Sequence, residues 1–232
     1  MPAFNEERAL GEVLSRLAAL PLPARVFVID DGSSDATART ARSRGASVIS
    51  HLINLGYARA VRTGIRFALD AGFDYCVTFD ADGQHDPASL WVLLERASRE
   101  DRPDIVIGSR FVAAGSYAAP LGRRLGMTIF SLLTRSVTGQ RIHDTTSGLK
   151  WMSRRAMRIV AGLSGGDLHS EMIIYSLVRG LKVVEVPVVM TERRVGESMY
   201  GAVSALIYPL KTLVSILVLF VQARQEGQLG DA

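Results

Sequence analysis

The stretch Arg25–Ser33 reads RVFVIDDGS, an apolar, β-branched run that ends in two aspartates and a glycine. A short apolar run closed by turn residues is typical of a strand buried on both faces. We expect such strands at Arg25–Asp30, Ala46–Ser50, Asp74–Phe79 and Asp104–Ile107. Helical patterns separate them at Asp35–Arg44, Tyr57–Ala71 and Pro87–Arg99. This alternation predicts an α/β fold with a mostly parallel central sheet flanked by helices.

Polar, glycine-containing clusters follow three of the predicted strands. They are Asp30–Ser33, Asp80–Gly83 and Gly108–Arg110. Ligands of open α/β sheets bind at the carboxyl ends of the strands. The candidate functional residues therefore gather where this fold would place a site.

The C-terminal third carries a different pattern. We expect a helix with basic residues at Leu121–Arg135 and a strand at Leu181–Thr191, whose Pro187 indicates an edge or a bulge. A last helix, roughly Ala202–Ala223, gathers its apolar residues on one broad face. It fits a helix lying on a bilayer or a helix in a core or oligomer interface. A membrane span fits less well because Lys211 lies in its middle.

The bulk composition bounds the class of protein. The 232 residues are 48% hydrophobic and 22% charged, which is enough for one sizeable globular domain. The net charge of +4 favours phosphate-bearing partners or an anionic membrane surface. The single cysteine, Cys76, fits a reducing compartment, and polar Asn5–Arg8 interrupts any signal peptide.

The triplet Asp80-Ala81-Asp82 predicts a metal site. Its two carboxylates, two positions apart after a strand, can face one ion if the chain turns at Gly83. Oxygen ligands without a His/Cys cluster indicate Mg²⁺ or Mn²⁺ rather than Zn²⁺, and Gln84 could add a neutral oxygen. A solvated turn is the structural alternative for this triplet.

The acidic cluster Asp30–Asp35 could accept hydrogen bonds from a ribose or base, and its Ser34 or Asp35 could cap the next helix.

Five ordered motifs resemble those of the family 2 glycosyltransferases of the GT-A fold, especially the dolichol- and polyprenyl-phosphate mannosyl- and glucosyltransferases. They are Pro2–Glu7, Ile29–Thr37, Asn54–Tyr57, Asp80–His85 and Gly108–Phe111. The resemblance implies a single Rossmann-like GT-A domain over residues 1–200. The amphipathic helix and tail at 201–232 follow it, on the membrane surface or in a core or interface.

The resemblance also implies roles for matched residues. The base and ribose of a nucleotide sugar would contact Pro2, Phe4, Glu6 and Asp31, and the metal would be held by Asp80, Asp82 and Gln84, with Ala81 beside the donor. The donor diphosphate would lie under Arg193, Arg194 and Ser198, and the acceptor beside Arg110, Arg124 and Asp144. Of these, Asp82, Asp144, Arg193 and Arg110 would be catalytic. Each arginine could instead be a solvated surface residue, and Asp144 the cap of a turn.

The reaction so implied is an inverting transfer of a hexose. The donor would be a nucleotide-diphosphate sugar of the GDP-mannose or UDP-glucose type, and the acceptor a polyprenyl phosphate at the inner face of the cell membrane. A phosphate acceptor is already nucleophilic, whereas a sugar hydroxyl would need a base, for which Asp144 or Glu171 would serve. Nucleic acid is not an expected partner; a homo-oligomer or a membrane-protein partner is left open.

Two other functions stay open: transfer to a sugar hydroxyl in cell-envelope polysaccharide synthesis, and a catalytically weak nucleotide-sugar-binding protein. A dinucleotide-dependent oxidoreductase is disfavoured because no Gly-x-Gly-x-x-Gly follows a strand. The Gln-x-x-Arg-Trp motif of processive synthases is absent as well, and the first loop, Asn5-Glu6-Glu7, is acidic where a sugar nucleotidyltransferase would be basic.

The sequence departs from the family pattern at two places. Family members carry an apolar strand directly before the Pro-x-x-Asn-Glu motif, so we expect the sheet to lack a central strand before Pro2. In addition, Met199 stands where many relatives place a lysine. We therefore expect the contacts to the base to be weakened and the diphosphate to rely on the neighbouring arginines.

Overall fold

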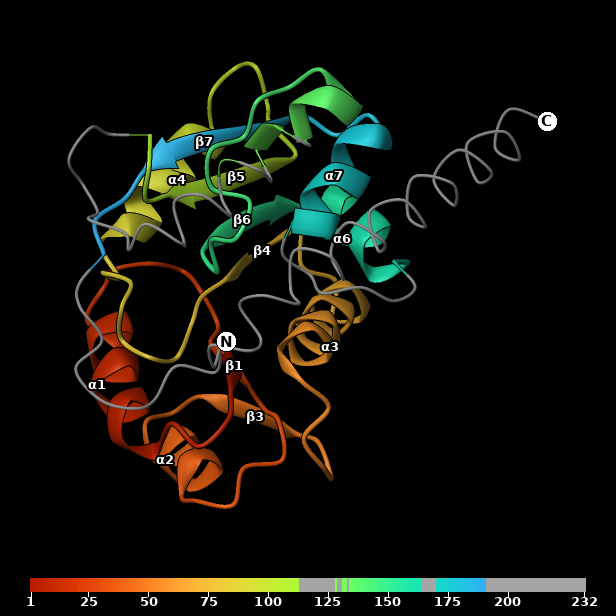
Figure 1. Ribbon diagram of the computed structural model, residues 1–232. Coiled ribbons are helices and arrows are strands. Elements are labelled where there is room, and N and C mark those ends of the chain that lie inside the picture. The colour runs from red at the N-terminus through yellow and green to blue at the C-terminus, as the bar shows by residue number, and fades with distance from the viewer. Residues whose placement is uncertain (113–127, 129–130, 133, 164–169, 191–232) are drawn as a thin grey trace.

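The computed structural model describes residues 1–112, 128, 131–132, 134–163 and 170–190. These residues form two β-sheets flanked by helices (Figure 1). The strands are β1 (Pro2–Ala3), β2 (Phe27–Asp30), β3 (Ser47–Ser50), β4 (Tyr75–Thr78), β5 (Ile105–Ser109), β6 (Lys150–Ser153) and β7 (Val183–Pro187). The helices are α1 (Glu7–Ala18), α2 (Thr37–Ser43), α3 (Tyr57–Asp70), α4 (Ser89–Ala97), α6 (Arg154–Ala161) and α7 (Ser170–Val178).

The first sheet has the order β1-β2-β3 and is entirely parallel. The second has the order β4-β6-β5-β7, in which β6 runs antiparallel to β4 and β5 while β5 and β7 are parallel. The α/β fold and the mostly parallel sheet are thus confirmed. The four strands and three helices predicted before residue 112 are present, and so is the strand predicted at Leu181–Thr191, which is β7. Their bounds differ from the predicted ones by at most four residues.

Helices cover both faces of the sheets. In Figure 1, α1 and α4 lie on one side and α3, α6 and α7 on the other. Strand β5 is buried along its whole length and serves both layers. Its Ile105 and Ile107 pack with the α3, α6 and α7 residues, whereas Val106 packs with Leu93 of α4. This alternation follows from the two-residue period of a strand, and each buried aliphatic side chain stabilises the fold by roughly 1.5–3 kcal/mol.

Strand β7 is an edge strand, as Pro187 indicates. Its only sheet neighbour among the described strands is β5, and Pro187 lies opposite Ser109 in the register. A proline lacks the N–H needed to bond a second neighbour, so the edge is the position that it tolerates. The strand therefore ends beside the carboxyl end of β5, where Arg110 follows.

The C-terminal predictions lie mainly outside the described residues. This applies to the last helix at 202–223, to the tail, and to most of the helix expected at Leu121–Arg135. The proposed division at residue 200 lies there too. Within the described part of the chain, no helix combines the length and apolarity that crossing a bilayer requires.

Strand β1 is short and begins the first sheet. It pairs Pro2 with Ile29 and Ala3 with Asp30. One residue further back, the Met1 amino group donates to the Phe27 carbonyl over 2.8 Å. Among the described strands, β1 and β4 belong to separate sheets.

Candidate active site

Asp80 and Asp82 lie in a tight turn directly after β4. Gly83 has a φ of 76°, a left-handed conformation that glycine adopts without strain. The Gln84 amide donates to Asp82 Oδ1 over 3.0 Å and closes the turn. The Tyr57 hydroxyl donates to Asp80 Oδ1 over 3.1 Å, and His85 Nε2 lies 3.5 Å from Asp80 Oδ2. The turn expected at Gly83 is present, and it places both carboxylates at one strand end.

The electrostatics keep the Asp80 carboxylate ionised. Burial raises its pKa, but the neighbouring His85 and Tyr57 side chains and the Lys150 charge outweigh burial and lower the pKa to about 2. Among the described residues, no group of three or more His, Cys, Asp or Glu side chains is arranged to hold a metal. Two carboxylates fit Mg²⁺ or Mn²⁺ bound jointly with substrate, because such ions fill their shells with water and phosphate oxygens.

Arg110 and Asp144 form a closely coupled pair. The Arg110 backbone amide and Nε donate to Asp144 Oδ2 over 3.0 and 2.7 Å, and a terminal guanidinium nitrogen donates to Oδ1 over 2.7 Å. The same nitrogen donates to Thr146 Oγ1 over 2.7 Å. Burial of Asp144 raises its pKa, but the Arg110 hydrogen bonds and charge reverse this, so the pKa is held below its usual value. The pair, 34 residues apart, is a fixed ionic unit.

Glu185 of β7 holds the loop that carries Asp144. Its Oε2 accepts the His143 amide over 2.8 Å, and its Oε1 accepts the Asp144 amide over 2.8 Å. The His143 ring Nδ1 lies 3.0 Å from Oε2. The Glu185 side chain is only 8% exposed. Because charged acceptors make strong bonds to backbone N–H groups, this residue fixes the start of the loop at residues 143–148.

Gly148 joins the loop at residues 143–148 to the turn that carries Asp80 and Asp82. A Cβ atom built on Gly148 would lie 1.8 Å from Asp80 Oδ2, so the backbone of residue 148 packs directly on that carboxylate. Lys150 lies just beyond, buried in β6, and its Nζ donates to the Ser147 carbonyl. Burial lowers the pKa of Lys150 to about 8, while Asp80 and Asp144 both act to raise it. One buried cation therefore faces both halves of the site.

Asp31 organises the other side of the strand ends. It is 3% exposed, and its two oxygens accept the Leu55 and Gly56 amides over 2.9 and 2.8 Å. His51 Nδ1 lies 2.7 Å from Asp31 Oδ1. Asp31 thus ties residues 51–56 to the end of β2. Its role toward a ribose or base remains a proposal.

The first loop meets the Asp30–Asp35 loop. The Ser34 amide donates to Asn5 Oδ1, and the Asn5 amide donates to Ser33 Oγ, both over 3.0 Å. Pro2 lies in β1, and the Glu6 amide donates to Thr37 Oγ1 over 2.8 Å. The Phe4 side chain is 40% exposed, so an aromatic surface beside the strand ends is open to a ligand. The N-cap expected at Ser34 or Asp35 is wrong, because the N-cap residue of α2 is Ala36, although Asp35 Oδ1 accepts the Thr37 amide over 2.9 Å.

Two of the remaining candidate residues are buried, and the others lie outside the described part of the chain. Ala81 is buried in the turn, and Glu171 is buried on α7. Arg124, Arg193, Arg194 and Ser198 lie outside the described residues. Sequence reasoning did not single out Tyr57, Thr146, Lys150 or Glu185. The signal for Tyr57 was its position at the end of the Asn54–Tyr57 motif.

A GT-A-like α/β sheet with paired carboxylates and an arginine at its strand ends defines a class of sugar-transferring proteins. The model described as "Glycosyl transferase family 2" matches residues 1–159, and the chain belongs to this family.

Similar proteins agree with this assignment. The chain is 31% identical over 238 residues to the undecaprenyl-phosphate mannosyltransferase of Micrococcus luteus, with 98% of this chain and 95% of that protein covered. It is 31% identical over 193 residues to the dolichyl-phosphate hexose transferase of Haloferax volcanii, covering 83% and 82% of the two chains.

A solved structure shares the fold. It is the glucosyl-3-phosphoglycerate synthase of Mycobacterium tuberculosis in complex with Mn²⁺, UDP-glucose and phosphoglyceric acid. The TM-score is 0.71 at 18% identity, and the match covers 94% of this chain and 77% of that one. At this identity the likeness establishes the architecture.

Proposed function

We propose that this chain transfers a hexose from a nucleotide-diphosphate sugar to a polyprenyl phosphate, with inversion at the anomeric carbon, at a membrane surface. The main support for this proposal is the packing of Gly148 on Asp80. This contact brings the turn of Asp80 and Asp82 next to the loop that holds the Arg110–Asp144 pair. The two relatives are named for transfer to undecaprenyl phosphate and dolichyl phosphate. A charged, phosphate-bearing acceptor fits a site whose second half centres on a guanidinium.

The donor side of the site has an acidic and an aromatic part. Asp80 and Asp82 would hold Mg²⁺ or Mn²⁺, which would stabilise charge on the departing diphosphate. The Mn²⁺ bound with UDP-glucose in the structural neighbour supports a divalent ion in this fold. The Tyr57 hydroxyl and His85 orient the Asp80 carboxylate, and the exposed Phe4 ring offers a stacking surface for a base.

The acceptor side favours a phosphate over a sugar hydroxyl. Asp144 is fully buried, accepts three N–H groups of Arg110, and has a pKa below its usual value. A carboxylate so stabilised in its ionised form is a weak base, so it would deprotonate a hydroxyl poorly. A phosphate oxygen needs no base. Asp144 would instead orient Arg110, and Arg110 would hold the phosphate in line with the donor carbon.

A transfer assay tests this proposal. Purified protein is incubated with GDP-mannose or UDP-glucose, Mg²⁺ or Mn²⁺, and a short polyprenyl phosphate, and the glycosylated lipid is measured by mass spectrometry. We expect lipid-linked hexose with at least one donor, its loss with EDTA, and its recovery on adding either ion. The matched polyprenol without phosphate should yield no product.

Variants separate the competing functions. Arg110→Lys keeps the charge but loses the bidentate geometry, so we expect a raised KM for the lipid phosphate with little change in the KM for the donor. Product formed on the polyprenol or on a saccharide, and not on the phosphate, would support the hydroxyl-acceptor alternative. Donor binding in a thermal-shift assay without any transfer or donor hydrolysis would support the binding-protein alternative.

A further inference from the structure

Lys150 is a buried charge inside the second sheet. It lies on β6, opposite Thr78 of β4 and Ile107 of β5, and it is only 2% exposed. A lysine is almost never buried so completely without charged partners. The Asp80 and Asp144 carboxylates are such partners, because the charge of each favours the ammonium form of Lys150. The cation is therefore stabilised by two carboxylates from separate segments of the chain.

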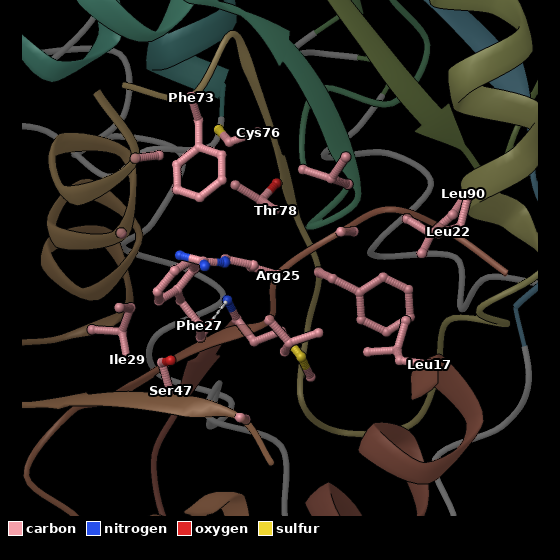
Figure 2. Close-up of a pocket in the computed structure, with 18 of the residues that line it drawn as sticks. Leu17, Leu22, Arg25, Phe27, Ile29, Ser47, Phe73, Cys76, Thr78 and Leu90 are labelled. Carbon is pink, nitrogen blue, oxygen red and sulfur yellow. Dashed lines mark hydrogen bonds between the residues drawn. The ribbon is translucent and has the colours of Figure 1, made fainter. Parts of the chain in front are cut away.

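The loop before β6 fixes where this ammonium lies. Its Nζ donates to the Ser147 carbonyl. The next residue, Gly148, packs on Asp80 Oδ2, and the Gly148 carbonyl accepts the Thr78 hydroxyl over 2.7 Å. Thr78 is one of the β4 residues labelled in Figure 2, where this strand borders a cavity of about 970 Å³. The ammonium is thus tied to the same short segment that touches Asp80.

Two carboxylates and two cations share this part of the interior. Arg110 is bound to Asp144 through three N–H groups, so its charge is matched within that pair. The Lys150 charge acts on Asp80 as well, together with the His85 side chain. Water and salt screen charges poorly inside a protein. The Lys150 ammonium would therefore repel a divalent ion held by Asp80 and Asp82.

A diphosphate would offset this repulsion. It brings negative charge, and its oxygens can occupy the positions that Mg²⁺ or Mn²⁺ leaves open beside protein carboxylates. We propose that the Lys150 ammonium makes binding of the divalent ion at Asp80 and Asp82 dependent on the donor diphosphate, so that ion and diphosphate bind together. This inference rests on the donor half of the proposed function. Lys150 is then a positioning residue that acts through the Asp80 carboxylate.

A purely structural role for Lys150 predicts the opposite effect on the ion. If the lysine only held the Ser147 carbonyl, removing its charge would loosen the segment on which Asp80 packs and would weaken the binding of an ion. If the charge itself repels the ion, removing it strengthens the binding of an ion without nucleotide. The sign of the change therefore separates the two roles.

Binding of Mn²⁺ to the full 232-residue chain tests this inference. The dissociation constant is measured at pH 7 by electron paramagnetic resonance, with and without UDP or GDP. We expect at least one of these nucleotides to tighten Mn²⁺ binding by about tenfold or more. Linkage requires that Mn²⁺ then tighten the binding of that nucleotide by the same factor, which calorimetry checks.

Variants at Lys150 isolate the charge. Lys150→Gln is neutral and keeps an amide N–H that can donate to the Ser147 carbonyl. We expect this variant to bind Mn²⁺ alone about tenfold more tightly than the unaltered chain, and the effect of the nucleotide to shrink by a similar factor. Lys150→Arg keeps the charge and should retain the weak binding of Mn²⁺ alone. Lys182→Gln is the matched control, because the Lys182 ammonium is half-exposed and paired with Asp101, and it should leave the Mn²⁺ affinity unchanged.

Two results would overturn the inference. One is a Lys150→Gln variant that unfolds cooperatively on heating but binds Mn²⁺ alone no more tightly than the unaltered chain. The other needs no variant: it is an equal affinity of the unaltered chain for Mn²⁺ with and without either nucleotide. Neither measurement involves a lipid acceptor. A chain that binds Mn²⁺ as expected but transfers no hexose would therefore refute the proposed function and leave this inference standing.

Discussion

At the scale of single residues, Asp144 acts through its partner. Its oxygens are occupied by Arg110, and its carboxylate has no exposed surface. Removing one member of a buried ion pair leaves the other charge uncompensated, which typically costs about 3–5 kcal/mol. Under the proposed function, Asp144 would therefore position the Arg110 guanidinium, and the groups around Asp80 would carry the reaction.

Asp82→Ala should remove metal-dependent turnover while leaving the fold intact. The Asp82 side chain is partly exposed, and the left-handed conformation of Gly83 holds the turn in which it lies. Removing the Asp82 carboxylate should therefore shift Tm by only about 2 °C or less. Loss of a metal ligand should lower kcat by about 100-fold or more, since the ion contributes several kcal/mol of charge stabilisation. Transfer assays and thermal unfolding check this. Full turnover in the variant would refute the metal assignment.

Gly148→Ala should inactivate the protein by displacing Asp80. The added Cβ would overlap Asp80 Oδ2, so either the carboxylate or the loop must move, at a cost of about 1–3 kcal/mol. Gly162→Ala is the matched control, because its Cβ would have its nearest contact at an ordinary 3.5 Å, with the Ile159 carbonyl oxygen. We expect lost transfer and a lowered Tm for the first variant and neither for the second. Equal activity in both would show that Asp80 tolerates displacement.

Single-residue roles were only partly predictable from the sequence. The turn at Gly83 follows from local chemistry, and so does the hydrogen bond from the Thr37 amide to Asp35 just before α2. The Arg110–Asp144 bond joins residues 34 positions apart, and no local pattern encodes it. Lys150 was missed because a lysine is ordinarily exposed, and its burial is tolerated here only beside two carboxylates.

At the scale of elements, β7 and the loop before β6 behave as one unit through Glu185. Glu185→Gln should loosen this loop, since an amide offers one acceptor oxygen where the carboxylate serves the His143 and Asp144 amides with two. Leaving a buried N–H poorly satisfied costs about 1–3 kcal/mol. We expect a lowered Tm and a raised KM for the lipid phosphate. The control is Glu95→Gln, whose side chain is 78% exposed, and an equal response of both variants would contradict the role of Glu185.

The elements found from the sequence are those with clear periodicity. β2, β4 and β5 are β-branched or apolar runs, and α3 has a regular apolar stripe. β6 was missed because its Lys-Trp-Met-Ser sequence has no β-branched residue and owes its strand conformation to pairing with β4 and β5 on both sides. The pairing of β6 with two neighbours thus overrides its local preference. α1 was also not predicted, although Leu10, Val13 and Leu14 form its buried face.

At the scale of the whole molecule, the free energy of unfolding should depend on pH through the Met1 amino group. Its pKa is about 6 in the folded chain and 8.0 as the ordinary value, so between pH 6 and 8 the unfolded chain binds a proton that the folded chain does not. Stability should therefore rise across this window, by on the order of 2 kcal/mol, and level off above pH 8. Denaturant unfolding at several pH values measures this.

An N-terminally acetylated chain is the control for this pH dependence. It carries no titratable amino group and is otherwise the same chain. The difference between the two unfolding profiles isolates Met1. Identical profiles would show that the amino group is solvated in the folded state.

The C-terminal segment bears on membrane attachment. Deleting the residues after Met199 should release the protein from anionic liposomes, since the apolar face expected at 202–223 and the nearby basic residues would bind the surface together. Sedimentation with vesicles containing anionic lipid, compared with neutral vesicles, measures this. Unchanged binding of the shortened chain would instead support a core or interface role for the last helix.

The contact between Gly148 and Asp80 has a consequence for how the two substrates bind. If the donor lies at Asp80 and the acceptor at Arg110, as proposed, both would contact the segment that Gly148 packs against Asp80, so a ligand that moves Asp80 is expected to move the chain leading to Asp144. Linkage then requires that each substrate change the affinity of the other by the same factor. Donor and acceptor are therefore expected to bind cooperatively. The close packing that couples the two binding sites is possible because Gly148 has no side chain.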